Sequence, residues 1–187
     1  MALDATQVRV GLTGNLYTAP VGTPMPTDST TVLAVAWKDL GYVDTDGLTV
    51  TPNADVTGIG AWQSDYDVRR MTTKREFSTK FKLMQRNTET MLLAFGGGTV
   101  VVAAGVSTYT PPAGSATYER AFVLEVRDGL LADRWTMYRG FPSVSGDIAF
   151  KKDEATTFDM EIGALADSVA NVWKLVSNDV TALVATA

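Results

Sequence analysis

The feature that most constrains the fold of this chain is a period of two in its apolar residues, interrupted at short intervals by turn-forming residues. Residues 74–86 show it best, with apolar and polar side chains on opposite faces of an extended chain: Phe77, Phe81 and Leu83 against Glu76, Ser78, Lys80 and Lys82. Successive side chains of a β-strand point to opposite sides, so this alternation is typical of a half-buried strand. Its recurrence along the chain predicts a mainly β fold.

Further segments are predicted as strands. Val8–Pro20 is a first strand whose glycines indicate a bulge. Residues 117–140 contain two strands joined at Asp128-Gly129, the strongest hairpin-turn signal in the chain. Residues 99–105 are apolar throughout, which fits either a strand buried on both faces or one that faces another subunit. The tail 171–187 reads as a last strand and an apolar end that docks on a neighbour.

One short helix is predicted in residues 87–98. Asn87 or Thr88 can cap its start, Glu89 lies in the first turn, and an apolar run then ends in Gly96-Gly97-Gly98. Because these glycines follow the helix, they form a stop or a tight passage and not a phosphate-binding loop.

Two segments are expected to shape the surface. Residues 21–28 contain Pro24 and Pro26, which predict a stiff, extended connector. Residues 51–73 are polar, long and glycine-bearing, and they predict a projecting arm. The residues that we expect to contact another subunit lie in and beside this arm: Trp62, Asp65, Tyr66, Asp67, Arg69, Arg70, Lys74 and Arg75.

A second hairpin is predicted over residues 143–167. If 152–156 form its loop, Asp147 lies opposite Glu161, with Asp159 on the same face. Like charges across a strand pair are destabilising, so such a face needs either full exposure to water or a cationic partner.

Catalysis finds little support in the composition. The 187 residues include no histidine and no cysteine, which excludes disulfides, thiolate metal sites and every Ser-His-Asp or Cys-His arrangement. Asp44-Thr45-Asp46-Gly47 resembles the opening of a calcium loop, but the other ligands are missing and a turn is favoured. We therefore expect no catalytic residue, cofactor or metal. The rival reading is a carbohydrate-binding or glycosidase β-sandwich that uses Asp147 and Glu161.

The charges are segregated along the chain. Residues 1–68 carry eight acids and two bases, residues 69–86 seven bases and one acid, and residues 87–187 twelve acids and seven bases. The first two blocks, with net charges of −6 and +6, suit complementary surfaces that orient one subunit against another. No apolar run reaches the ~20 residues that span a bilayer, so no membrane partner is expected. The length predicts a single domain over residues 1–187.

A series of short motifs resembles the tail tube proteins, or major tail proteins, of long-tailed bacteriophages. The motifs follow in order over about half of the chain: Val21-Gly22-Thr23-Pro24, Pro26-Thr27-Asp28, Trp37, Leu40-Gly41, Asp46-Gly47, and the segment from Phe77 to Gly98 that follows the arm. None of these motifs is catalytic, so the resemblance depends on their order.

The resemblance implies a β-sandwich flanked by a helix, with hexameric rings whose inner strands form a continuous barrel. Rings would stack head to tail around the tape measure protein, and double-stranded DNA would later pass through without sequence-specific binding. Implied partners are the protein itself, the tape measure protein, and the tail terminator and distal tail proteins. The implied location is the virion tail, assembled in the host bacterial cytoplasm. The immunoglobulin-like C-terminal domain of some relatives is not expected here. A type VI secretion tube protein, which shares the fold, is the nearer alternative.

The acidic hairpin acquires an expected role from this resemblance. A conduit lined with lysine and arginine would retain DNA, because phosphates bind cationic surfaces through counterion release. Asp147, Asp159 and Glu161 are therefore our candidates for a phosphate-repelling lumen.

Overall fold

The computed structural model describes residues 7–114 and 117–180. It is mainly β, as predicted, with one short helix, α1 (Thr88–Ala94). The strands in chain order are β1 (Thr13–Pro20), β2 (Lys38–Asp39), β3 (Val43–Ala61), β4 (Ser64–Leu83), β5 (Thr99–Ala103), β6 (Val106–Thr110), β7 (Arg120–Asp128), β8 (Leu131–Val144), β9 (Phe158–Leu165) and β10 (Trp173–Ser177).

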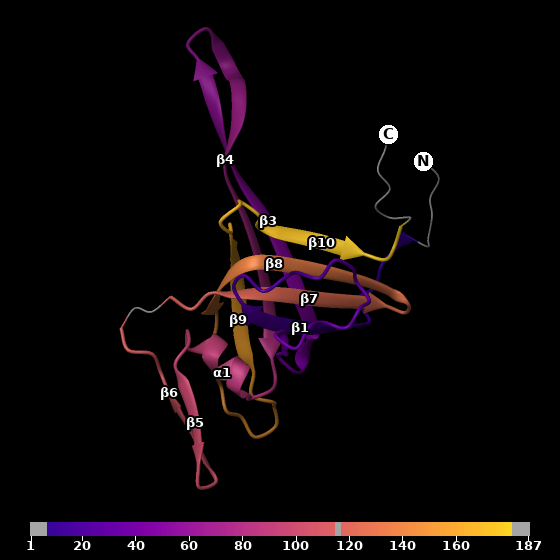
Figure 1. Cartoon of the computed structure of the whole chain (residues 1–187). Coiled ribbons are helices and arrows are strands. Elements are labelled where there is room, and N and C mark those ends of the chain that lie inside the picture. The colour runs from indigo at the N-terminus through magenta and orange to yellow at the C-terminus, as the bar shows by residue number, and fades with distance from the viewer. Residues whose placement is uncertain (1–6, 115–116, 181–187) are drawn as a thin grey trace.

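The strands form a two-layer sandwich that is continuous through β8. Seven strands follow the order β2-β1-β7-β8-β9-β4-β3, and β10 also pairs with β8. The first part of β8 pairs with β10 and its last part with β9. In Figure 1, β1, β7, β8 and β10 run across the view, whereas β3, β4 and β9 cross them steeply. The strand β8 therefore connects the two layers of the predicted sandwich.

Gly140 marks the corner of β8. The β7–β8 register shifts between Arg120 and Phe122, next to the Arg120↔Gly140 pair. A Cβ at residue 140 would lie 2.7 Å from the Ile162 Cγ2 and 2.7 Å from the Phe122 ring. Glycine is needed here because the two layers approach each other more closely than a side chain would permit.

The main core lies between the layers. The crossing strands contribute ten buried side chains, listed from the first layer to the second: Leu16, Phe122, Leu124, Met137, Phe77, Phe81, Leu83, Phe158, Met160 and Ile162. The predicted alternation in β4 is thus confirmed. Helix α1 adds Leu93, and the Asn87 side chain caps it by accepting a hydrogen bond of 2.9 Å from the Thr90 N–H. The predicted helix and its cap are therefore confirmed.

The predicted connector, residues 21–28, and the residues that follow it as far as Trp37 lie on the outer face of the sheet, and we call the whole segment 21–37 the connector from here on. Met25, Leu33 and the buried Trp37 pack against the buried side chains of Ala121 and Val123 in β7. Asp28 accepts hydrogen bonds from the N–H groups of Thr31 and Thr30, which hold the pKa of its carboxyl below the ordinary value. Residues 21–37 thus cover a second small core.

A buried ion pair lies beneath this connector. The Arg134 Nε donates to the Glu125 carboxylate over 2.8 Å, and both side chains are at most 3% exposed. Arg134 also donates to the backbone carbonyl of Asp28 over 3.0 Å, and Arg127 donates to Glu125 over 2.6 Å. The pair therefore joins β7 and β8 to the connector through charged hydrogen bonds.

The predicted arm is a β-hairpin formed by β3 and β4. The two strands pair from their bases to Ala61↔Ser64 and extend well beyond the body of the sandwich (Figure 1). Where the arm leaves the body, Trp173 of β10 stacks on Phe77 of β4 with ring centroids 4.7 Å apart, and on Trp135 with centroids 5.5 Å apart. Strand β10, the predicted last strand, therefore packs against the arm at its base. The apolar end predicted for residues 181–187 lies outside the described residues.

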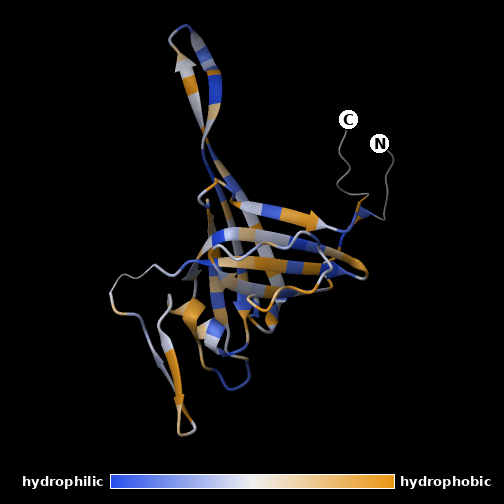
Figure 2. Cartoon of the chain, in the orientation of Figure 1, coloured by the Kyte–Doolittle hydropathy of each residue, from blue (hydrophilic) through white to orange (hydrophobic). Residues whose placement is uncertain are grey.

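A second hairpin, formed by β5 and β6, projects from the end of α1. Of the two readings for residues 99–105, burial on both faces is wrong, because β5 is largely exposed and pairs only with β6 within the described residues. Figure 2 shows the apolar stretch of β5 on the outside of the molecule. The hairpin predicted at Asp128-Gly129 is confirmed, with Gly129 at a φ of +61°.

Candidate functional site: assembly surfaces

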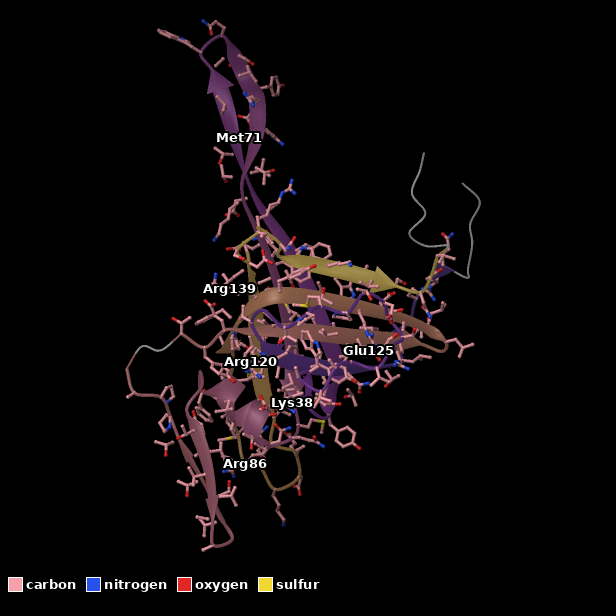
Figure 3. All side chains as sticks on the ribbon, viewed as in Figure 1. Lys38, Met71, Arg86, Arg120, Glu125 and Arg139 are labelled. Atoms are coloured by element: carbon pink, nitrogen blue, oxygen red, sulfur yellow. The ribbon has the colours of Figure 1, made fainter. Side chains whose placement is uncertain are left out.

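The arm exposes apolar side chains along its length. Trp62 at its tip is fully exposed, and Tyr66 is 84% exposed. Other large apolar residues of the arm are also exposed: Val56, Ile59, Val68 and Met71. Figure 3 shows the arm's side chains, with Met71 labelled, standing apart from the crowded body. A single subunit thus leaves to solvent a surface with the composition of an interface.

The charged residues of the arm are partly paired. Arg70 contacts the Asp67 carboxylate over 3.3 Å, and Lys74 forms an ion pair with Glu76. In the part of the chain that the structure describes, no acidic group lies within salt-bridge distance of Arg69 or Arg75. Asp65 lies at the exposed tip beside Ser64. The arm therefore presents unpaired guanidinium groups to any partner.

The expected register of the acidic hairpin is wrong. Strand β8 ends at Val144, and β9 pairs with it as Ser143↔Glu161 and Val144↔Met160. Asp147 therefore does not lie opposite Glu161, but in a connection that runs from residue 145 to 157 and is longer than predicted. The strand ends where the Ser145 N–H donates to the Asp159 carbonyl and the chain turns through Gly146.

Asp159 and Glu161 have the cationic partner that their proximity requires. They lie directly opposite Lys82 and Lys80 of β4, and Glu161 forms an ion pair of 3.3 Å with Lys80. Lys82 donates to Asp46 over 2.8 Å, and this hydrogen bond raises the pKa of the ammonium group. The outer face of the β4–β9 pair is consequently a charge-balanced ladder.

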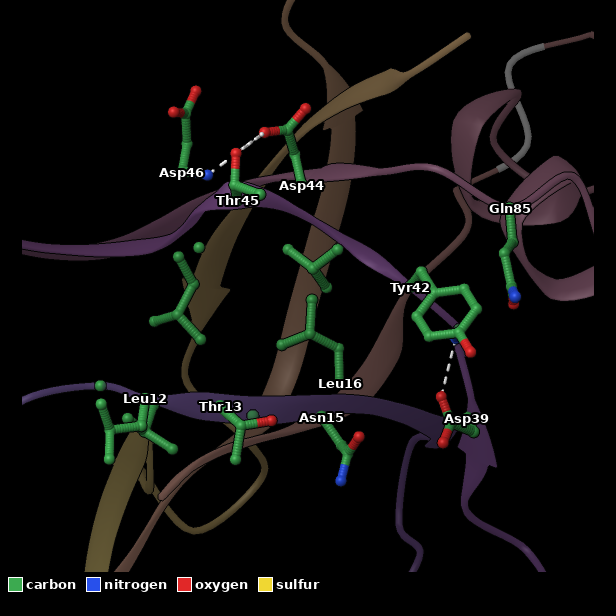
Figure 4. Close-up of a pocket in the computed structure, with 17 residues that line it drawn as sticks. Leu12, Thr13, Asn15, Leu16, Asp39, Tyr42, Asp44, Thr45, Asp46 and Gln85 are labelled. Atoms are coloured by element: carbon green, nitrogen blue, oxygen red, sulfur yellow. Dashed lines mark hydrogen bonds between the residues drawn. The ribbon is translucent and has the colours of Figure 1, made fainter. Parts of the chain in front are cut away.

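A pocket of about 830 Å³ opens between β1 and β3. These strands lie near the two ends of the strand order, and we call the gap between them the seam (Figure 4). Its lining includes Leu12 and Leu16 on one side and Val43 and Leu48 on the other. Neither Asp147 nor Glu161 lines it, so the seam does not contain the carboxylate pair that a sugar-cleaving site would use.

The Asp44–Gly47 motif forms one rim of the seam and lies within β3, as an irregularity of that strand and not as a separate turn. It occupies the register shift between Val43 and Leu48. The Asp44 carboxylate accepts hydrogen bonds from the Asp46 N–H and the Thr45 hydroxyl, which lower the pKa of Asp44 (Figure 4). Among the described residues, no three carboxylates are grouped as metal ligands.

Sequence reasoning missed the seam and the buried ion pair. Alternating polarity identifies a strand but not its position in the sheet order, so the pattern gave no sign that β1 and β3 would flank a gap. The apolar residues 99–105 were a usable signal for the exposed β5–β6 hairpin, because one of their two readings was a strand that faces another subunit.

Two comparisons bear on the identity of the chain. A search of curated proteins gives no significant match. The sequence profile of the family described as "Phage tail tube protein" matches residues 1–187. None of the helices in the described ranges is long and apolar enough to cross a bilayer. Since the family profile covers the whole chain, this protein belongs to the phage tail tube protein family and is a structural, non-enzymatic component of the virion tail.

Proposed function

We propose that this protein closes into hexameric rings that stack into a hollow tube, encloses the tape measure protein and conducts DNA during ejection. The observation that carries the proposal is the β3–β4 arm, which extends an exposed tryptophan away from a fully formed sandwich. An isolated subunit gains nothing from such a projection, whereas a head-to-tail interface needs two different surfaces on each copy.

The arm is the proposed bridge between subunits or rings. Trp62 and Tyr66 would supply apolar contact, since aromatic residues dominate interface energetics. The charged residues Asp65, Asp67, Arg69, Arg70, Lys74 and Arg75 would set its register, because complementary charges orient encounters more than they add affinity. We further propose that residues 1–187 act as one domain and assemble in the host cytoplasm. The tail terminator and distal tail proteins would cap the tube ends.

Electron microscopy of the purified protein tests the assembly. After concentration, we expect rings or hollow tubes of uniform width in negative stain and a matching fast-sedimenting species. A higher concentration favours association by mass action, because each subunit leaves an apolar surface exposed. A protein that stays monomeric at every concentration, both alone and with a tube-initiating complex, would contradict the proposal.

The lumen is proposed to include Asp159, Glu161 and the adjacent Asp147. Gly146, which precedes Asp147, lies so close to Asp159 that a Cβ added at residue 146 would be 3.0 Å from the carboxylate. In the ladder, Lys80 and Lys82 are matched by acidic groups, so the face carries no excess of positive charge to bind phosphate.

Reversing the charges of the ladder tests this assignment. With Asp159→Lys and Glu161→Lys together, four lysines would face the lumen in each subunit, and we expect tubes that form but eject DNA slowly or not at all. The measurement is the rate of genome release from phage particles that carry the variant. The control is Asp153→Lys with Glu154→Lys, an equal charge change in the exposed loop. Normal ejection by the ladder variant would place this face outside the lumen.

A further inference from the structure

We propose that the β5–β6 hairpin of one subunit inserts its apolar tip into the seam between β1 and β3 of a neighbouring copy. This inference rests on the proposed function, because it names the surfaces through which one copy would join the next. It concerns a different projection from the β3–β4 arm and a pocket for which the subunit itself provides no occupant among its described residues.

The hairpin is held in a fixed direction at its base. The Tyr109 hydroxyl donates to the Gly97 carbonyl over 2.7 Å, and the Tyr109 ring packs against Phe95 with centroids 5.4 Å apart. Gly98 has a φ of +103°, and a Cβ there would lie 2.4 Å from the Thr110 carbonyl oxygen. A projection ordered in this way loses little conformational entropy when it binds.

The tip of the hairpin is apolar and uncharged. Val101, Val102 and Val106 are 58%, 73% and 63% exposed, and residues 99–110 contain no acidic or basic side chain. Each of the two strands pairs only with the other within the described residues. The hairpin therefore offers both apolar surface and two unpaired strand edges to a partner.

The seam offers the matching features. Apart from its short pairing with β2 at Tyr17 and Thr18, β1 has a strand partner on one side only, as does β3, within the described ranges. Leucine and valine side chains line the space between these edges, whose volume falls in the range of ~300–1,000 Å³ typical of ligand pockets. An inserted strand would gain backbone hydrogen bonds, as in β-strand addition, and would bury its valines.

A second copy is the occupant that these surfaces favour. No hairpin residue lines the seam of its own chain, and the hairpin points away from the body in Figure 1. The uncharged tip also avoids an electrostatic conflict with the seam's acidic rim of Asp39, Asp44 and Asp46. Because hairpin and seam are different surfaces of one chain, their contact is heterologous, and it closes into a ring when the rotation between copies permits.

Disulfide trapping tests the contact, since the chain has no native cysteine. We would combine Val102→Cys with Asn15→Cys, and separately with Thr45→Cys, one on each side of the seam. Oxidation of assembled protein should give a ladder of covalent oligomers on a non-reducing gel for at least one pair, because a disulfide requires Cβ atoms about 3.5–4.5 Å apart. The control pair is Val102→Cys with Val35→Cys, a site on the connector that is 86% exposed. After oxidation, this control should run as a monomer on the non-reducing gel.

A charge at the tip gives an independent readout. Val102→Asp should abolish rings and tubes while leaving the urea unfolding curve unchanged, whereas Val35→Asp should assemble normally. Three results would overturn the inference and leave the proposed function standing. The first is that the wild type forms tubes but neither seam pair gives a ladder, and the second is that Val102→Cys alone gives a ladder. The third is that Val102→Asp still forms tubes. Failure of the wild type to assemble would contradict both.

Discussion

A protein in which residues 56–73 are replaced by Asn-Gly is expected to fold normally and to form no tubes. The flanking pair Asp55↔Lys74 is already in antiparallel register, and Asn-Gly suits the tight turn of a two-residue hairpin. The replaced residues contribute no side chain to the buried core, so the sandwich should keep its stability. Negative-stain microscopy and sedimentation, with near-ultraviolet circular dichroism to verify the fold, would measure the result.

The control for this variant is a deletion of comparable exposure elsewhere. Removing residues 151–154 takes out part of the long β8–β9 connection, including the exposed Lys151–Glu154 ion pair. That variant should still assemble if the arm is the specific requirement. Tubes of normal width and length from the arm-less protein would show that stacking does not need the arm.

Glu125→Leu is expected to lower the free energy of unfolding by about 3–5 kcal/mol, the usual cost of breaking a buried ion pair by removing one partner. The substitution removes the carboxylate that Arg134 contacts in an almost fully buried position. Asp28 would remain beside the guanidinium group, through its backbone carbonyl at 3.0 Å and its half-exposed carboxylate at 3.7 Å, but this longer ion pair does not replace the buried 2.8 Å contact with Glu125. Urea unfolding followed by tryptophan fluorescence would measure the change.

Two further variants separate charge burial from lost packing. Glu125→Leu combined with Arg134→Leu should recover much of the loss, because the double change leaves no isolated buried charge. Glu154→Leu breaks an exposed pair and should cost only about 0–1 kcal/mol. A loss below about 1 kcal/mol for Glu125→Leu alone would mean that water reaches Arg134 in solution.

Elements determined by short-range pattern could be predicted from the sequence. The alternating strand through Phe77 and Phe81, the helix capped by Asn87 and the turn at Asp128-Gly129 all depend on residues within a few positions of one another. Their signals are periodicity, capping and turn chemistry, which act locally. The projecting arm could be predicted as well, because residues 51–73 form a long, polar and glycine-bearing segment.

Features that depend on distant segments could not be predicted. Glu125 alternates with apolar residues as an outward-facing side chain does, yet it is buried because the connector, from the first quarter of the chain, covers that face. The position of Asp147 depended on where β8 stops, and the hydrogen bond that marks this end comes from Ser145 to β9. The local pattern of residues 143–151 does not show where β8 ends, because that end depends on the pairing with β9.

The position of β1 in the sheet has a consequence for how the protein is made. β1 is synthesised first of the strands, but its long partner is β7, and 103 residues separate Thr18 from Ala121 where the two meet. At ribosomal speeds of about 5–20 residues per second, β1 waits roughly 5–20 seconds for that partner. During this interval the edges of β1 can pair with other nascent chains. On a heavily translated message, wider spacing of the ribosomes or a bound chaperone would therefore reduce aggregation until β7 emerges.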